Sequence, residues 1–212
     1  MIDVLCRDDD ILVVDKPSGM AVHPSPGFET GTMTDELARR FPQMAGVGSK
    51  ERPGVVHRLD VETSGVMVFA LSQRAYLKLR EMFESHAEVV KTYLAVLHGA
   101  PKKRKGTLDG PVGREHLRAI THWNVLAKHG PVSLVEFRIE TGRMHQIRIH
   151  AAELGCPVVG DRTYGDAARD RRLRTRPLRH LLHAVELSFL HPTTHRRVTF
   201  SAPPPADLVY AG

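Results

Sequence analysis

Apolar runs bounded by turn residues are the main pattern along this chain, and they predict a protein built mostly of strands. The predicted strands cover residues 11–14, 20–22, 55–59, 66–71, 88–97, 119–126, 132–141, 156–161, 185–190 and 198–201. The sequence Lys-His-Gly-Pro at residues 128–131 predicts the turn of a hairpin between two of these strands.

Three segments show the spacing of an amphipathic helix instead. They run to about residue 41 from an N-cap at Thr32 or Thr34, from the N-cap Ser72 to about residue 86, and over residues 145–154 before Gly155. Strands outnumber helices and the two do not alternate regularly. This pattern favours an α+β fold with a mixed, largely antiparallel central sheet and flanking helices over a doubly wound α/β fold. At 212 residues the chain predicts a single domain.

The net charge of the chain is positive. Lys and Arg number 30 against 24 Asp and Glu, which gives +6 with neutral His. A basic balance favours a polyanionic partner such as nucleic acid, because each neutralised phosphate releases counterions. The densest basic runs are residues 102–105 and the six arginines between Arg169 and Arg179. Each run can be an ordinary solvated surface or a contact to a phosphate backbone.

Cysteine usage and hydropathy favour a reducing compartment inside the cell. Cys6 and Cys156 form no Cys-x-x-Cys pair, which argues against a zinc ribbon and a disulfide framework. The N-terminal residues lack the pattern of a signal peptide, and no apolar run approaches the roughly 20 residues that span a bilayer. His145 and His150 are five apart, which suits a shared metal on one helix less well than a spacing of four. We therefore expect a soluble, cytoplasmic protein with no metal and no membrane partner.

One polar segment between two apolar runs contains the candidate site. His57, Arg58 and Asp60 lie beside strand-like runs rich in Val, where a charge is costly unless it is used or paired. Asp60 can be a catalytic carboxylate at the end of a strand. It can equally be a turn residue whose side chain bonds local backbone amides. Lys16, which follows the apolar run 11–14, can contact a phosphate or be a solvated loop charge.

Several motifs, in order along the chain, resemble those of the RluA-type pseudouridine synthases, which isomerise uridine in RNA. The matching segments are residues 14–19 with 22–24, 57–65, 91–93, 141–150, 160–165 and 182–184. The resemblance implies the family fold, with an active-site cleft across a mixed sheet. The chain is similar to the short, single-domain branch, so we expect one catalytic domain over residues 1–212 and no separate N-terminal RNA-binding domain of the S4-like kind.

The resemblance also implies three catalytic residues. Asp60 would act on the ribose, either as a base at C2′ or as a nucleophile at C1′. Arg148 would form an ion pair with Asp60 and keep its carboxylate ionised. Tyr93 would stack on the uracil and help to remove the C5 proton. This reaction needs no cofactor.

Five further residues are expected to bind the substrate. A uridine stacked in structured RNA must be flipped to reach a cleft, and Arg58 resembles the residue that fills the vacated space. Ile147 would pack under the base, and His57, Lys16 and Arg143 complete the expected contacts.

The expected partner is structured RNA, either transfer RNA, large-subunit ribosomal RNA or both. We expect a monomer that acts without an obligate protein partner. Two alternatives stay open: a non-catalytic RNA-binding protein on the same scaffold, and a nucleosidase that releases uracil from free nucleosides. The presence of Asp60, Tyr93 and Arg148 together disfavours the first, and the second has no need of the basic loops.

Overall fold

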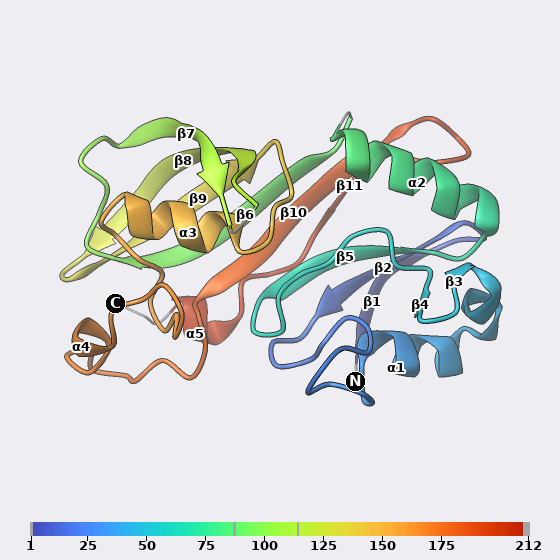
Figure 1. Cartoon of the computed structure of the whole chain (residues 1–212), viewed down its shortest axis with the longest axis horizontal. Coiled ribbons are helices and arrows are strands. Elements are labelled where there is room, and N and C mark those ends of the chain that lie inside the picture. Colours follow the sequence, from blue (N-terminus) through green and yellow to red (C-terminus); the bar gives the residue numbers. More distant parts are fainter. Residues whose placement is uncertain (1, 87, 114, 210–212) are drawn as a thin grey trace. The chain divides into compact units, whose positions relative to one another are not determined.

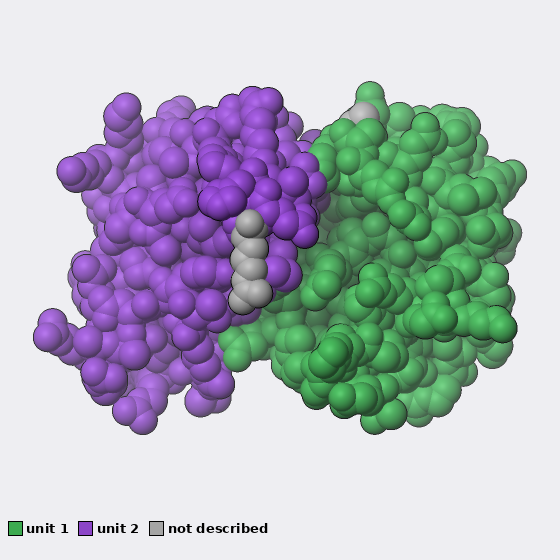
Figure 2. All heavy atoms as spheres, in the orientation of Figure 1, with its two compact units in different colours: residues 1–89, 186–202 green, residues 90–185, 203–212 purple. Residues whose placement is uncertain are grey.

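The computed structural model of the chain describes residues 2–86, 88–113 and 115–209. Its contacts divide the chain into two compact units, which Figure 2 shows in different colours. Unit 1 contains Met1–Val89 and Glu186–Ala202, and unit 2 contains Val90–Val185 and Pro203–Gly212. The expectation of one catalytic domain over residues 1–212 stays a prediction.

Unit 1 is built on antiparallel strands (Figure 1). β1 (Asp3–Arg7) pairs with β2 (Ile11–Lys16), and β2 pairs with β5 (Ser64–Ala70). β11 (Arg197–Ser201) pairs with the end of β10 (Leu182–Leu190), whose residues from Glu186 onward lie in this unit. All positions of β5 are buried. A strand covered on both faces has no exposed polar side, which explains its continuous apolar run in the sequence.

Local side-chain caps start both long helices of unit 1. α1 (Met33–Arg40) begins with a capping box, in which Thr32 accepts a hydrogen bond from the Asp35 amide and the Asp35 carboxylate accepts one from the Thr32 amide. α2 (Gln73–Ser85) begins at Ser72, whose hydroxyl oxygen accepts a hydrogen bond from the Ala75 amide. The chain between them contains the 3-10 helix η1 (Pro42–Gly46), β3 (Gly48–Ser49) and β4 (Arg52–Pro53). Both helices begin where the sequence predicts.

Unit 2 contains a second antiparallel arrangement, in the order β6-β9-β8-β7 (Figure 1). Its strands are β6 (Val90–His98), β7 (Lys105–Val112), β8 (Leu117–His129) and β9 (Val132–Ile139). Its helices are α3 (Gln146–Glu153), which contacts β7 and β8, and the short α4 (Ala167–Asp170) and α5 (Ala206–Val209). The predicted hairpin is β8 and β9, joined at Gly130 and Pro131.

Two apolar features hold unit 2 together. One is a buried cluster of Val96, Val132, Val159, Leu181 and Leu208. The other is Trp123 on β8, whose side chain is only 9% exposed and therefore packs, as expected, instead of lying open to a base. A Cβ atom at Gly106 would lie 2.4 Å from the Trp123 ring. The glycine on β7 is thus required by the close approach of the indole.

The α+β class with a mixed, mostly antiparallel sheet is confirmed. Three predicted strands are wrong. Residues 20–22 and 56–60 are irregular, and Val55 forms only an isolated bridge with Phe69. Residues 156–161 form no strand either, and Val158 makes only an isolated bridge with Leu97. Strand β7 is not predicted by the sequence, since its Gly, Pro and charged residues conceal it. In the part of the chain that the structure describes, no helix is long and apolar enough to cross a membrane.

Candidate active site

Asp60 lies in an irregular loop that leads into β5, not at the end of a strand. Its carbonyl oxygen accepts a hydrogen bond from the Thr63 amide at 3.1 Å, which closes a tight turn. Leu59 is buried and Asp60 is half-buried, whereas Arg58 is exposed. This alternation of buried and exposed side chains packs Leu59 into unit 1 and leaves Arg58 accessible. An accessible arginine fits the predicted role of Arg58 toward flipped RNA, which stays a prediction.

Lys16 ties this loop to the end of β2. Its side chain is fully buried, and its ammonium donates hydrogen bonds to the carbonyl oxygens of Pro17 at 2.9 Å, Val61 at 2.9 Å and Thr63 at 2.8 Å. The alternative that Lys16 is a solvated loop charge is therefore wrong, and its predicted contact to substrate stays a prediction. Three carbonyl oxygens use the three N–H donors of the ammonium, so Lys16 positions the Asp60 loop.

Two further hydrogen bonds join the same segments. The Ser18 hydroxyl donates to the carbonyl oxygen of Glu62 at 2.9 Å, and the Gly19 amide donates to that of Val61 at 2.9 Å. Gly19 has φ of +85°, a left-handed conformation that favours glycine. The Pro-Ser-Gly turn after Lys16 is thus shaped to hold the backbone on which Asp60 is mounted.

Replacing Lys16 with Met should destabilise unit 1 and loosen the Asp60 loop. Three carbonyl oxygens would lose a charged donor in a buried place, at a cost of about 2–4 kcal/mol. Urea unfolding and the rate of proteolytic cleavage between residues 57 and 63 measure the two effects. Lys78→Met is the matched control, because Lys78 is exposed on α2 and its ion pair is with the exposed Glu81. Equal stability of the two variants would show that Lys16 does not hold the loop.

Two contacts of His57 are to residues of unit 1. Its ring stacks on Phe83 of α2, with 4.4 Å between ring centroids and 8° between planes. Its Nε2 accepts a hydrogen bond from the Val68 amide of β5 at 3.1 Å. The predicted contact of His57 to the substrate stays a prediction.

The other predicted site residues lie in unit 2. Tyr93 is on β6, 9% exposed and opposite Phe137 of β9. Ile147 and Arg148 are both buried on α3. Arg143 is half-buried before that helix, and its Nε donates to the carbonyl oxygen of Arg118 at 3.3 Å.

Arg148 forms a two-pronged ion pair with Asp161, a residue to which the sequence assigns no role. Its Nε donates to Oδ2 of Asp161 at 2.6 Å and its Nη2 donates to Oδ1 at 2.8 Å. Oδ1 also accepts hydrogen bonds from the amides of Thr163 and Tyr164. Burial by itself raises the pKa of Asp161, but these hydrogen bonds and the guanidinium charge hold it below its ordinary value. Asp161 therefore stays ionised and fixes the plane of the Arg148 guanidinium.

Local pairing at the start of α3 fixes the residues around Arg143. The Gln146 side chain accepts hydrogen bonds from the Thr141 hydroxyl at 2.7 Å and from the Arg143 amide at 3.0 Å. Its amide nitrogen donates to Thr121 of β8 at 2.8 Å. The segment between β9 and α3 is thus bound to the strands of unit 2 through buried polar contacts.

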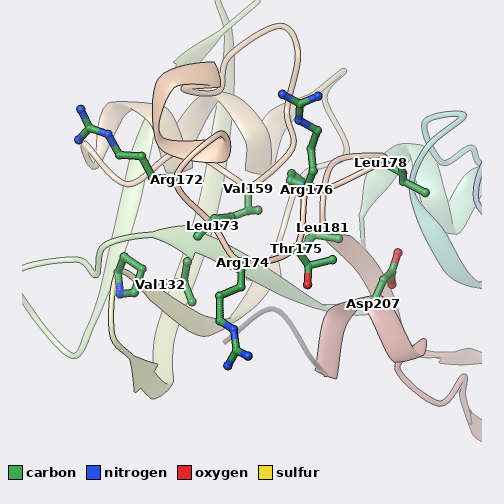
Figure 3. A pocket seen from close by; sticks show the side chains of 12 residues that line it. Val132, Val159, Arg172, Leu173, Arg174, Thr175, Arg176, Leu178, Leu181 and Asp207 are labelled. Carbon is green, nitrogen blue, oxygen red and sulfur yellow. The ribbon is translucent and has the colours of Figure 1, made fainter.

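A pocket of about 730 Å³ lies in unit 2 beneath the arginine loop, residues 171–178 (Figure 3). Val132, Val159 and Leu181 give it apolar walls. Arg172, Arg174 and Arg176 line it and are exposed, and Figure 3 shows their guanidinium groups spread outward from the loop. Among residues 2–86, 88–113 and 115–209, no carboxylate pairs with these three arginines. Their predicted contact to RNA phosphates stays a prediction, as does that of the exposed basic turn at residues 102–104.

The predicted catalytic residues are divided between the two units. Asp60 belongs to unit 1, and Tyr93 and Arg148 belong to unit 2. Their participation in one active site, and the predicted ion pair between Arg148 and Asp60, stay predictions.

Comparison with known proteins decides the family. A sequence model of the family described as RNA pseudouridylate synthase matches residues 10–153. The chain belongs to this family. The RluA-type resemblance and the enzyme class that it implies are thereby confirmed.

Similar proteins cover nearly the whole chain. One from Mycobacterium bovis, named an uncharacterized RNA pseudouridine synthase, is 42% identical over 98% of this chain and 71% of its own length. The ribosomal large subunit pseudouridine synthase D of Xanthomonas campestris is 40% identical over 98% of this chain and 67% of its own length. Among solved structures, human RNA pseudouridylate synthase domain containing 4 superposes with a TM-score of 0.80 at 27% identity, over 99% of this chain and 91% of that one.

Proposed function

We propose that this RNA pseudouridine synthase isomerises specific uridines in structured RNA, in transfer RNA, large-subunit ribosomal RNA or both. The observation that carries the proposal is the loop of Asp60, which a buried lysine and the turn after β2 hold by their hydrogen bonds. A relative 40% identical to this chain is named for the large ribosomal subunit. The net charge of +6 suits a polyanionic substrate.

In the proposed reaction, the bond from uracil N1 to ribose C1′ breaks, the base turns, and C5 bonds to C1′. Asp60 acts as a nucleophile at C1′ or as a base that removes the C2′ proton. Tyr93 stacks on the uracil and assists the loss of the C5 proton, which restores the aromatic base. No atom is gained or lost overall, so the residues only have to position the base and move protons.

Three further residues would support this reaction by keeping Asp60 ionised and by binding the flipped uridine: Arg148, Arg58 and Ile147. Arg148 would keep the Asp60 carboxylate ionised, and its own guanidinium is already oriented by Asp161. The exposed Arg58 would occupy the space left by the flipped uridine. The buried Ile147 would pack against the base. We further infer a monomer that works in the cytoplasm without an obligate protein partner.

Pseudouridine mapping on cellular RNA, with and without the gene for this chain, tests the proposal. Chemical derivatisation followed by reverse transcription should lose one or a few signals in ribosomal or transfer RNA when the gene is removed. The purified protein should restore them on unmodified RNA. Unchanged signals together with RNA binding would favour a non-catalytic RNA-binding protein. Release of uracil from free uridine would favour a nucleosidase.

A further inference from the structure

Lys91 is a buried cation for which the described residues supply no acidic partner. Its side chain is 6% exposed, on β6 of unit 2. Within the described residues, its ammonium donates one hydrogen bond, to the carbonyl oxygen of Thr141 at 3.4 Å, close to the upper limit for such a bond. In the described parts of the chain, no carboxylate forms an ion pair with Lys91. A buried ammonium has three donors, so this environment leaves it poorly compensated.

A second cation lies near Lys91. The positive charge of Arg143 acts on the ammonium, and the side chain of Arg143 bonds only the carbonyl oxygen of Arg118 among the residues that the structure describes. Burial lowers the pKa of Lys91 to about 8, and repulsion from Arg143 adds to this effect. The buried Lys91 ammonium makes one long hydrogen bond, Arg143 adds a second positive charge, and no carboxylate of the described residues pairs with Lys91, so an external anion would stabilise this place.

The strand puts this cation beside the proposed base-stacking residue. Side chains of a strand alternate between its faces, so Lys91 and Tyr93 share one face of β6, about 7 Å apart along the strand. The burial pattern agrees, since Lys91 and Tyr93 are buried and Thr92 between them is not. A nucleotide likewise presents a base at one end and an anionic phosphate at the other.

We propose that Lys91 and Arg143 bind a backbone phosphate of the RNA next to the uridine on which Tyr93 stacks. This inference rests on the proposed function and adds a substrate-binding residue to it. Lys91 in this role contributes affinity for the phosphate backbone and fixes where the target nucleotide enters, without reading the sequence of the RNA.

The thermal stability of a Lys91 variant distinguishes a phosphate-binding role of Lys91 from a structural role. If Lys91 serves a ligand, Lys91→Met removes an uncompensated buried charge and should raise the Tm of the RNA-free protein by several degrees at pH 7. The folded pKa is below the unfolded one, so the folded state binds fewer protons between pH 8 and the ordinary lysine value of about 10.5. The destabilisation caused by the buried charge of Lys91 is therefore complete below pH 8 and decreases as the pH rises. The difference in Tm between Lys91→Met and the wild-type protein should shrink accordingly. Lys128→Met, at an exposed position on β8, should leave the Tm unchanged.

Kinetics test the phosphate contact itself. With an RNA that the wild-type protein modifies, Lys91→Met should lower kcat/KM about ten- to a hundredfold, as expected for a lost charged hydrogen bond. Lys91→Arg keeps the charge and should recover part of this loss. The kcat/KM of the wild-type protein should decline above pH 8, whereas that of Lys91→Arg should not.

A modified substrate then locates the partner. A short RNA with an uncharged methylphosphonate beside the target uridine should slow the wild-type protein and have little further effect on Lys91→Met. A lower Tm of Lys91→Met, or unchanged kcat/KM and pH dependence in a protein that does form pseudouridine, would overturn the inference while leaving the proposed function intact. Absence of pseudouridine formation by the wild-type protein would instead remove the proposed function.

Discussion

Asp60→Asn should abolish pseudouridine formation while the protein still folds and binds RNA. The substitution keeps the size of the side chain and removes its negative charge, so neither attack at C1′ nor proton removal at C2′ is available. We expect turnover to fall by roughly three orders of magnitude or more. Single-turnover pseudouridine formation on an RNA identified by mapping measures the loss. RNA affinity and circular dichroism should match those of the wild-type protein.

Glu62→Gln is the matched control for this prediction. Glu62 is a second carboxylate on the same loop, and its backbone carbonyl, not its side chain, receives the hydrogen bond of Ser18. The control variant should keep most of its activity. Equal losses in the two variants would mean that the loop needs its overall charge. Full activity of Asp60→Asn would remove Asp60 from the catalytic role.

Local sequence signals predict much of the fold because their causes are local. Thr32 and Ser72 begin helices through hydrogen bonds to amides only three residues away. The hairpin of β8 and β9 follows from two apolar runs around a Gly-Pro turn. Strand β7 is missed because its Gly106 is selected by the indole of Trp123 on the paired strand, a contact that no window of the β7 sequence contains.

The site is less predictable because its contacts join distant residues. The sequence around Lys16 is typical of a loop. Its ammonium nevertheless donates a hydrogen bond to the carbonyl oxygen of Thr63, which is 47 positions away. Residues 55–59 are predicted to form a strand, but their backbone is irregular and the ring of His57 accepts a hydrogen bond from the distant Val68 amide. The family motif marks Asp60 as the candidate carboxylate, which stays a prediction, whereas the support of its loop by Lys16 is visible only in the folded chain.

The sequence indicates that the segment around Asp161 is significant, but it does not predict the ion pair of Asp161 with Arg148. Its segment matches a motif of the family, which marks it as significant. Only the structure reveals that its carboxylate is fully buried and holds Arg148 by two hydrogen bonds. The pair gives Arg148 a fixed orientation before any substrate arrives, and preorganised charge of this kind stabilises a developing charge without reorganisation.

Breaking this pair should destabilise the protein strongly. Arg148→Met leaves the buried Asp161 carboxylate without its cation, which costs about 3–5 kcal/mol. The folded pKa of Asp161 is below its ordinary value of 3.8, so the stability from ionised Asp161 is complete above that value. It is lost as the pH falls through the lower folded pKa. Urea unfolding at pH 7 and at a series of acidic pH values measures this effect. The difference in the free energy of unfolding between wild type and variant should narrow only in strong acid.

A double variant separates stability from catalysis at the same position. Replacing both partners, Arg148→Met with Asp161→Asn, removes the buried charges together, keeps an oxygen acceptor for the amides of Thr163 and Tyr164, and should recover most of the lost stability. Activity should stay low in the double variant, because the proposed support of the Asp60 carboxylate is gone. Recovery of activity along with stability would show that Arg148 serves the fold of unit 2 alone. Recovery of stability without activity is expected if Asp161 holds Arg148 in place for the reaction.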